Sequence, residues 1–341
     1  MHSQKQKLNL DGIGDKVSFK ESWRESTKKA PRTWVYALGI ILIFVGVYSV
    51  ILIYTLLRDG SVDSSLWGPG IIYLSIALIV SLGFMYKSHT RLRDFKNLSK
   101  FANRNGFKLV EELKSPYYSG SIFSAGKSLA VYNLLCGNWR NKNFELFNFT
   151  YSVRVGNKST TYNSGVLLVK LPRKIPHILF ENKKNNFLGL GALSSVIPAS
   201  SQKIELEGDF YKHFDVYVPK NYERDMLYFV TPELMSILAD KGFDYDVEVL
   251  DDELYIYKDT FFDFNNNEEI ENIFMIIESV GGEFSDNVRL YADERVANRS
   301  SNVVAQQGRR LKRRYVSRIS LIISILYIFI VLLFVYAHIT A

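Results

Sequence analysis

Three long apolar runs constrain the fold of this chain more than any other feature. They extend from Trp34 to Leu57, from Trp67 to Tyr86 and from Val316 to Ala337. Each run reaches the length of about 20 residues that a helix needs to cross the hydrocarbon core of a bilayer. A helix of a soluble protein needs a polar face, which these runs lack. We therefore predict three transmembrane helices.

The first run does not have the form of a cleaved signal peptide. Its apolar part is much longer than the roughly 7 to 15 apolar residues of a signal sequence, and it begins well inside the chain. The three spans divide the chain into four parts. We expect a basic cytoplasmic arm at 1–33, a two-helix transmembrane hairpin at 34–86, a cytoplasmic domain at 87–315 and a third transmembrane helix at 316–338.

Positively charged residues predict the orientation of the spans. The link between the first two spans, RDGSVDSSL, holds one arginine against two aspartates, whereas the segments after the second span and before the third are basic. Short basic segments stay in the cytoplasm, so we expect the N-terminus and the main domain inside and the C-terminus outside. The cations expected to lie at the membrane surface, against anionic headgroups, are Lys87, Arg91, Arg93, Arg309, Arg310, Lys312, Arg313 and Arg314.

Most of the excess positive charge that gives the net charge of +7 lies beside the spans. Each Lys or Arg near an anionic leaflet contributes on the order of 1 kcal/mol to membrane binding, so the charge does not require a nucleic acid. We predict no nucleic-acid partner. The single cysteine, Cys136, excludes an internal disulfide, which agrees with a reducing compartment.

The spans have the composition of anchors rather than of a pore. They contain no Asp, Glu or Lys, and a path for ions or protons needs ionisable groups inside the membrane. Small residues recur on single helix faces, where they allow close packing of the spans on each other or on another subunit. These residues, which could support an oligomer, are Gly39 and Gly46, Ala77 and Ser81, and Ser317, Ser320 and Ser324.

Between the second and third spans the pattern predicts an α+β domain, mainly antiparallel sheet with a few helices. Apolar and polar residues alternate from Asn143 to Leu171, at the period of strands. The segment TPELMSILADKG begins with a cap, a proline and an acid, and NEEIENIFMIIESVGG carries an apolar stripe, so both are expected to be helices. Strands and helices in this order favour α+β over a doubly wound fold. Further strands are expected at 129–135, 178–181, 214–218, 225–230, 245–250 and 254–258.

Several connections are also predicted. Turn signals lie at 156–157 and 163–165, and the acidic run at 250–253 would form the turn of a last hairpin. The two prolines of LPRKIPH, at 171–177, favour a rigid connector between strands. The polar region 285–314 is expected to be helical.

The segment GSIFSAGKS, at 120–128, is similar to a phosphate-binding loop but has the wrong spacing. Five residues separate its first glycine from the Gly-Lys pair, where the motif needs four, and a strand-like sequence follows where the motif needs a helix. We therefore expect Lys127 to be an exposed residue of a hairpin. No nucleotide or other cofactor is predicted.

Asp209, His213 and Asp215 form the densest cluster of acid and imidazole groups. If a strand begins at Phe214, His213 and Asp215 share one of its faces, as an ion pair or two metal ligands would. No second His or Cys lies nearby to complete a zinc site, so we predict no metal. The three residues are candidates for acid–base catalysis, and a structural or surface pair is the simpler interpretation.

The region from Asp240 to Glu294 contains seventeen acidic residues against three basic ones. A solvated surface is the simpler interpretation of this excess. The alternative is that the acidic face 240–294 points away from the anionic leaflet and binds a basic protein partner.

Three segments, NFELFNFTYSV, LPRKIPHILF and LEGDFYKHFDVYVPKNYERDMLYFVTPELMSIL, carry a resemblance. Together they resemble a group of uncharacterised bacterial inner-membrane proteins with an N-terminal membrane hairpin and a cytoplasmic domain of unknown function. The resemblance covers about half of the chain. It implies a bacterial inner-membrane location and no activity for any residue.

The sequence thus favours a membrane-tethered cytoplasmic module for binding or scaffolding. Attachment at both ends restrains the domain, which suits the presentation of one face to a partner. Two alternatives stay open. One is a membrane-associated hydrolase or lipid-modifying enzyme that uses Asp209, His213 and Asp215, and the other is an accessory subunit of a transport or secretion complex.

Overall fold

The computed structural model describes residues 7–15, 31–59, 67–155, 158–185, 198–206, 208–240, 243–298 and 301–312. The chain forms two compact units, one of Leu10–Phe101 and one of Met1–Asn9 with Ala102–Ala341. The third predicted span, together with Arg313 and Arg314, lies outside the described residues.

The first unit is built on two long helices, α2 (Pro31–Asp59) and α3 (Trp67–Asn105). In α2 the window Ile41–Arg58 has a mean hydropathy of 2.2, and none of it is buried. Within the described part of the chain, this is the one helix that is long and apolar enough to cross a membrane. The second predicted span is helical, as the first half of α3, but its crossing of a membrane stays a prediction.

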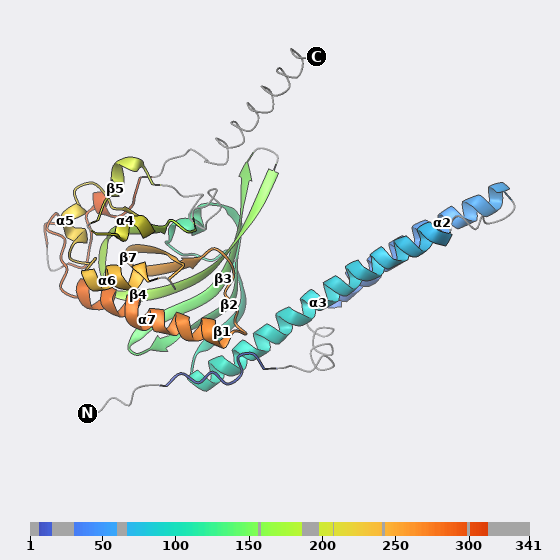
Figure 1. Ribbon diagram of the computed structural model, residues 1–341, viewed down its shortest axis with the longest axis horizontal. Coiled ribbons are helices and arrows are strands. Elements are labelled where there is room, and N and C mark those ends of the chain that lie inside the picture. The colour runs from blue at the N-terminus through green and yellow to red at the C-terminus, as the bar shows by residue number, and fades with distance from the viewer. Residues whose placement is uncertain are drawn as a thin grey trace, which may run out of the picture. The chain divides into compact units, whose positions relative to one another are not determined.

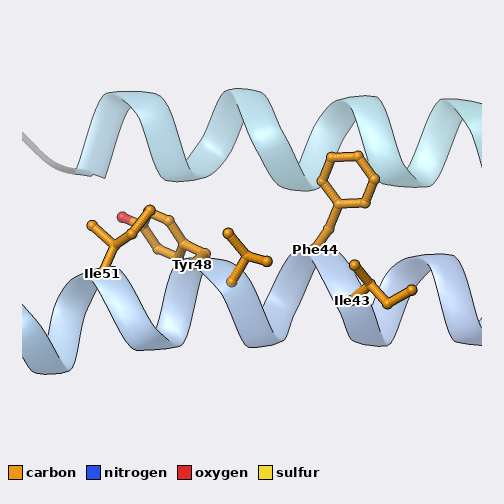
Figure 2. A pocket seen from close by; sticks show the side chains of 5 residues that line it. Ile43, Phe44, Tyr48 and Ile51 are labelled. Atoms are coloured by element: carbon orange, nitrogen blue, oxygen red, sulfur yellow. The ribbon is translucent and has the colours of Figure 1, made fainter.

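The small residues of the two helices differ in their packing. Ala77 and Ser81 of α3 are buried, and the Ser81 hydroxyl donates a hydrogen bond of 2.7 Å to the Ala77 carbonyl. By contrast, a Cβ added to Gly39 or Gly46 of α2 would meet no atom within 4 Å. A small apolar hollow of about 200 Å³ lies on α2, where it is lined by Ile43, Phe44, Val47, Tyr48 and Ile51 (Figure 2). Ala77 and Ser81 are therefore packed within the first unit, whereas Gly39 and Gly46 have open space beside them.

The second unit is an α+β domain around an antiparallel sheet of seven strands, which confirms the predicted fold class. The strand order is β1-β2-β3-β4-β6-β5, and β7 pairs with β4. The long β4 is central, because β3 pairs with its residues 158–169, β7 with residues between 165 and 180, and β6 with residues 179–182. The strands are β1 (Lys108–Lys114), β2 (Lys127–Trp139), β3 (Lys142–Val155), β4 (Lys158–Asn182), β5 (Lys203–Ile204), β6 (Phe214–Tyr217) and β7 (Asp246–Lys258).

Helix α7 (Asn267–Val288) crosses one face of the curved sheet (Figure 1). The ring of Phe274 in α7 meets Trp139 and Phe144 of the sheet, with centroids 5.2 and 5.4 Å apart. Helix α6 (Pro232–Ala239) packs beside α7. Helix α6 begins at the predicted cap, where the Thr231 hydroxyl accepts from the Leu234 amide. The side chain of Asn266 caps α7 by accepting from the amides of Glu268 and Glu269.

The opposite face of the sheet is lined with aromatic side chains, because residues on one side of a strand alternate with those on the other. We call it the aromatic face and define it by Phe147, Phe149, Tyr151, Tyr255 and Tyr257. The short helix η2 (Ser121–Ser124) covers it with Ile122 and Phe123, and the ring of Phe123 lies 4.5 Å from that of Phe149. The remaining short helices are α4 (Phe210–His213), α5 (Glu223–Met226), η4 (Ser200–Gln202) and η5 (Gln306–Gly308).

Two predicted turns are wrong because the strands continue through them. The acidic run at 250–253 lies inside β7, where Asp251 takes a φ of 55° and the register with β4 shifts. Such a bulge bends a strand without ending it. The predicted turn at 163–165 and the predicted connector at 171–177 likewise lie inside β4, the second at a register shift.

Two predicted elements are also wrong. The expected strand at 225–230 is instead the helix α5 followed by a turn, in which the Val230 amide bonds to the Met226 carbonyl. Of the region 285–314, residues 285–288 are helical, as the end of α7, while 299–300 and 313–314 lie outside the described residues. The described residues 289–298 and 301–312 are irregular chain, with η5 as a single short turn.

Candidate functional site

The two aspartates among the predicted catalytic candidates are each paired with lysine. Asp209, next to α4, is exposed and pairs with Lys212 at 2.7 Å, and this hydrogen bond and charge lower the pKa of its carboxyl group. Asp215 of β6 lies between two ammonium groups, 3.0 Å from Lys203 and 3.2 Å from Lys183. The structure thus gives the two aspartates separate cationic partners.

His213 ends α4, and its carbonyl accepts from the amide of Lys183 at 2.8 Å. Among the residues that the structure describes, no group of three His, Cys, Asp or Glu side chains is arranged to hold a metal ion. Acid–base catalysis by Asp209, His213 and Asp215 therefore stays a prediction, and the described contacts do not supply a built site for it.

The segment GSIFSAGKS encloses a carboxylate of its own chain. Ser121, at the start of η2, donates its amide to Glu248 Oε2 at 2.8 Å and its hydroxyl to Glu248 Oε1 at 2.5 Å. A Cβ on Gly120 would lie 2.3 Å from the Tyr257 hydroxyl, so only glycine fits there. At the other end of the segment Lys127 is exposed and begins β2, in agreement with its prediction as a hairpin residue.

Glu248 is fully buried on β7 and accepts hydrogen bonds from four donors. Besides the two from Ser121, its oxygens accept from His177 Nε2 at 2.7 Å and from the Tyr257 hydroxyl at 2.6 Å. Burial raises the pKa of Glu248, but the hydrogen bond and electrostatic attraction of His177, with the hydrogen bonds from Ser121 and Tyr257, outweigh it and lower the pKa to about 2. We call Glu248 and its three partners, Ser121, His177 and Tyr257, the Glu248 network.

The second nitrogen of the buried His177 holds the C-terminal end of the described chain. His177 Nδ1 accepts from the amide of Leu311 at 3.0 Å, and the Leu311 side chain belongs to the core beneath the aromatic face. Because Nδ1 accepts, the imidazole proton lies on Nε2 and is donated to Glu248. We call residues 309–312 the strap. The Glu248 network therefore joins η2, β4, β7 and the strap.

Lys312 of the strap is held through its backbone. Its amide donates to Gln202 Oε1 at 3.0 Å, and its carbonyl accepts from Gln202 Nε2 at 2.9 Å and from the Ala199 amide at 2.8 Å. The side chains of Arg309, Arg310 and Lys312 are exposed. Three of the cations predicted at the membrane surface thus point outward from a segment whose backbone is fixed.

The other predicted surface cations give less information. Arg93 pairs with the neighbouring Asp94 at 3.1 Å. Lys87 and Arg91 lie in α3, and their side chains are outside the described part of the structure. Contact of any of these residues with lipid stays a prediction.

An arginine clamp orders the chain before the strap. Arg295 pairs with Asp225 and Asp293 at 3.0 and 3.2 Å, and its guanidinium lies 4.0 Å from the centre of the Tyr222 ring. Asp293 also accepts from the Ala305 amide at 2.9 Å. Asp293, Arg295 and Ala305, which lie in irregular chain, are therefore held near α5 by charge, ring and hydrogen-bond contacts rather than by helix formation.

Many acidic side chains of the region 240–294 are already paired. Glu268 and Glu271 are exposed on α7, whereas Asp246 and Glu248 are buried. The acidic surface is thus smaller than the count of acids indicates. The ion pairs are Asp244 with Lys184, Asp251 with Arg310, Glu253 with Lys170, Glu269 with Lys258, Glu278 with Arg140, Asp286 with Arg289, and Asp293 with Arg295.

The sequence did not point to the Glu248 network. The prolines around it place His177 in a predicted connector, and the acidic composition of 240–294 places Glu248 in the acidic face. One local signal was present, since Glu248 lies between Val247 and Val249 in a strand with an apolar pattern. An acid in such a position is buried only with partners, but the partners are distant in sequence and cannot be identified locally.

Comparisons with known proteins give little further information. No family profile and no curated protein matches the chain. A solved structure that matches is the crystal structure of the mycobacterial trehalose monomycolate transport factor A, TtfA, with 11% identity, 57% of this chain and 94% of that chain covered, and a TM-score of 0.38. A similarity of this size supports no conclusion about fold or function.

Proposed function

We propose that this chain is a membrane-anchored protein of the bacterial inner membrane, whose α+β domain is a cytoplasmic module for binding or scaffolding. The observation that carries the proposal is α2, an apolar helix with no buried residue in its window Ile41–Arg58. Exposed apolar surface of this extent is stable in lipid and not in water. The second and third spans and the orientation belong to the proposal on the grounds of sequence alone.

A binding role is favoured over catalysis by the state of the ionisable groups. Glu248 is saturated by four donors within the core, and Asp209 and Asp215 are paired with lysines. A general acid or base must be able to reach a substrate. We propose the exposed part of the acidic face, with Glu268 and Glu271 on α7, as the surface for a basic protein partner.

Membrane attachment is tested by fractionating cells that express the full chain. The protein should stay in the membrane after alkaline carbonate washing, and a reporter fused after Ala341 should give an outside signal. Recovery in the soluble fraction would contradict the anchor. An inside signal with retained membrane association would contradict only the orientation.

The partner surface is tested by purifying the full chain in mild detergent. Charge reversal by Glu268→Lys with Glu271→Lys should reduce the capture of a basic partner, while Glu205→Lys, an exposed acid outside the acidic face, should not. Equal capture by all three proteins, at any salt concentration, would remove the proposed surface.

The accessory-subunit alternative is favoured by one observation, the open space at Gly39 and Gly46. Glycines on one helix face allow a second helix to approach closely in lipid. Replacing both glycines with leucine should separate a co-purifying membrane subunit, and a chain that purifies alone before and after the change would contradict this alternative.

A further inference from the structure

The strap is bound in the manner of a peptide ligand. The side-chain amide of Gln202 donates to the carbonyl of Lys312 and accepts from its amide, which is the pairing that a neighbouring strand would make. Ala199 adds a backbone donor to the same carbonyl. Gln202 and Ala199 therefore bind the backbone of Lys312 and not its side chain.

Side-chain specificity of the site comes from Leu311, the residue before Lys312. Leu311 is 7% exposed and inserts into the core beneath the aromatic face, while His177 Nδ1 accepts its amide. On the surface, Arg310 lies 3.5 Å from Asp251 of the β7 bulge. The site therefore fits an extended peptide with a cation, then an aliphatic residue, then a residue of any type.

We propose that these residues form a peptide-recognition site whose resident ligand is the strap of the same chain, and that the strap is a releasable latch between the folded core and the chain beyond Lys312. The hydrogen bonds of His177 make the latch part of the Glu248 network. Release of the strap removes the acceptor role of Nδ1 and the apolar plug of Leu311 together. That the chain beyond Lys312 leads to a membrane span rests on the proposed function. The peptide-recognition site itself does not depend on it.

Two substitutions at His177 separate its two roles. In His177→Gln the amide reaches the position of Nε2, so a donor to Glu248 is kept and the acceptor for Leu311 is lost. In His177→Asn the amide oxygen lies near the position of Nδ1, so the acceptor is kept and the donor to Glu248 is lost. The first variant should free the strap, and the second should weaken the core.

The measurement is hydrogen exchange of the full chain in detergent. We expect exchange of the Leu311 and Lys312 amides to be about tenfold faster in His177→Gln and in Gln202→Ala, as the loss of one or two hydrogen bonds allows, with β4 and β7 still protected. His177→Asn should accelerate exchange in β4 and β7 instead. The matched control is Gln306→Ala, which removes an exposed amide of η5 next to the strap and should change neither.

A synthetic peptide with the sequence QQGRRLKRR, added in excess to the wild-type chain, should displace the strap and accelerate exchange at Leu311 and Lys312. A scrambled peptide of the same charge should not. The proposal is overturned if both peptides act equally, or if Gln202→Ala and His177→Gln leave the strap protected or expose the whole sheet with it. Membrane fractionation of the same variants is unaffected by these outcomes, so failure of the anchor and failure of the latch are distinguished.

Discussion

Glu248 and Asp246 lie two residues apart on β7 and are both buried, but their surroundings shift their pKa values in opposite directions. Glu248 has four donors, which lower its pKa to about 2 against the effect of burial. Asp246 is 1% exposed, and burial raises its pKa well above the usual value, against the hydrogen bond of 2.7 Å from the Asn182 amide. A buried carboxylate is stable as an anion only where enough donors face it.

Glu248→Gln should lower the free energy of unfolding of the domain by about 3–5 kcal/mol, because an amide cannot accept from all the donors that face the carboxylate. The folded-state pKa lies below the ordinary glutamate value of 4.5, so the stabilisation is present above about pH 4.5 and is lost as the pH falls through about 2. Urea unfolding of the detergent-solubilised chain between pH 2 and 7 measures both effects. Glu205→Gln, at an exposed site, is the control, and an equal acid response of the two variants would contradict the assignment.

Asp246→Asn should have the opposite outcome. The raised pKa means that the folded wild type favours the protonated form, so its stability falls as the pH rises from about 4 through the raised value. Asparagine cannot ionise and keeps an oxygen for the Asn182 amide. We expect the variant to match or exceed the wild type in unfolding midpoint at pH 7, with the difference shrinking toward pH 4. A large loss of stability at pH 7 would show that the carboxylate is needed as an anion.

At the scale of elements, the sequence predicts what local chemistry determines. The cap of α6, the apolar stripe of α7 and the alternation of β3 identify elements that the structure contains. The continuity of β4 and β7 was not predictable, because prolines and aspartates that normally form turns are held here in bulges by long-range pairing. Likewise, α5 is fixed by Arg295, which is distant in sequence.

A pair of glycine substitutions tests the fit of two elements. Gly120→Ala should destabilise the domain by about 1–3 kcal/mol, because the new methyl group would overlap the Tyr257 hydroxyl between η2 and β7. Gly282→Ala, inside α7, meets nothing closer than 3.7 Å and should stabilise the domain by about 0.5–1 kcal/mol through helix propensity. Thermal unfolding of both variants measures the difference. Equal effects would contradict the close approach at Gly120.

At the scale of the whole molecule, features that depend on neighbouring residues in the sequence are predictable, and features that join residues distant in the sequence are not. The α+β class and the apolar helix α2 follow from pattern and composition. The Glu248 network does not, because Ser121 and Glu248 are 127 residues apart and only the folded sheet brings them together. The contacts of the strap could not be predicted for a related reason. Its arginines and lysine have the composition of a membrane-surface segment, whereas its Leu311 side chain lies in the core and its backbone is bound by distant residues.

The membrane anchor is testable in isolation from the rest of the chain. Residues 31–59, placed in a host protein that reports insertion by glycosylation, should insert across the membrane. Val50→Arg with Ile53→Arg, at positions 66% and 57% exposed on α2, should raise the apparent free energy of insertion by about 5–7 kcal/mol and prevent it, since each central arginine costs about 2.5–3.5 kcal/mol. Leucine at the same two positions should leave insertion unchanged. If the wild-type segment fails to insert, α2 is not a transmembrane helix, and its exposed apolar side chains must then be covered by protein.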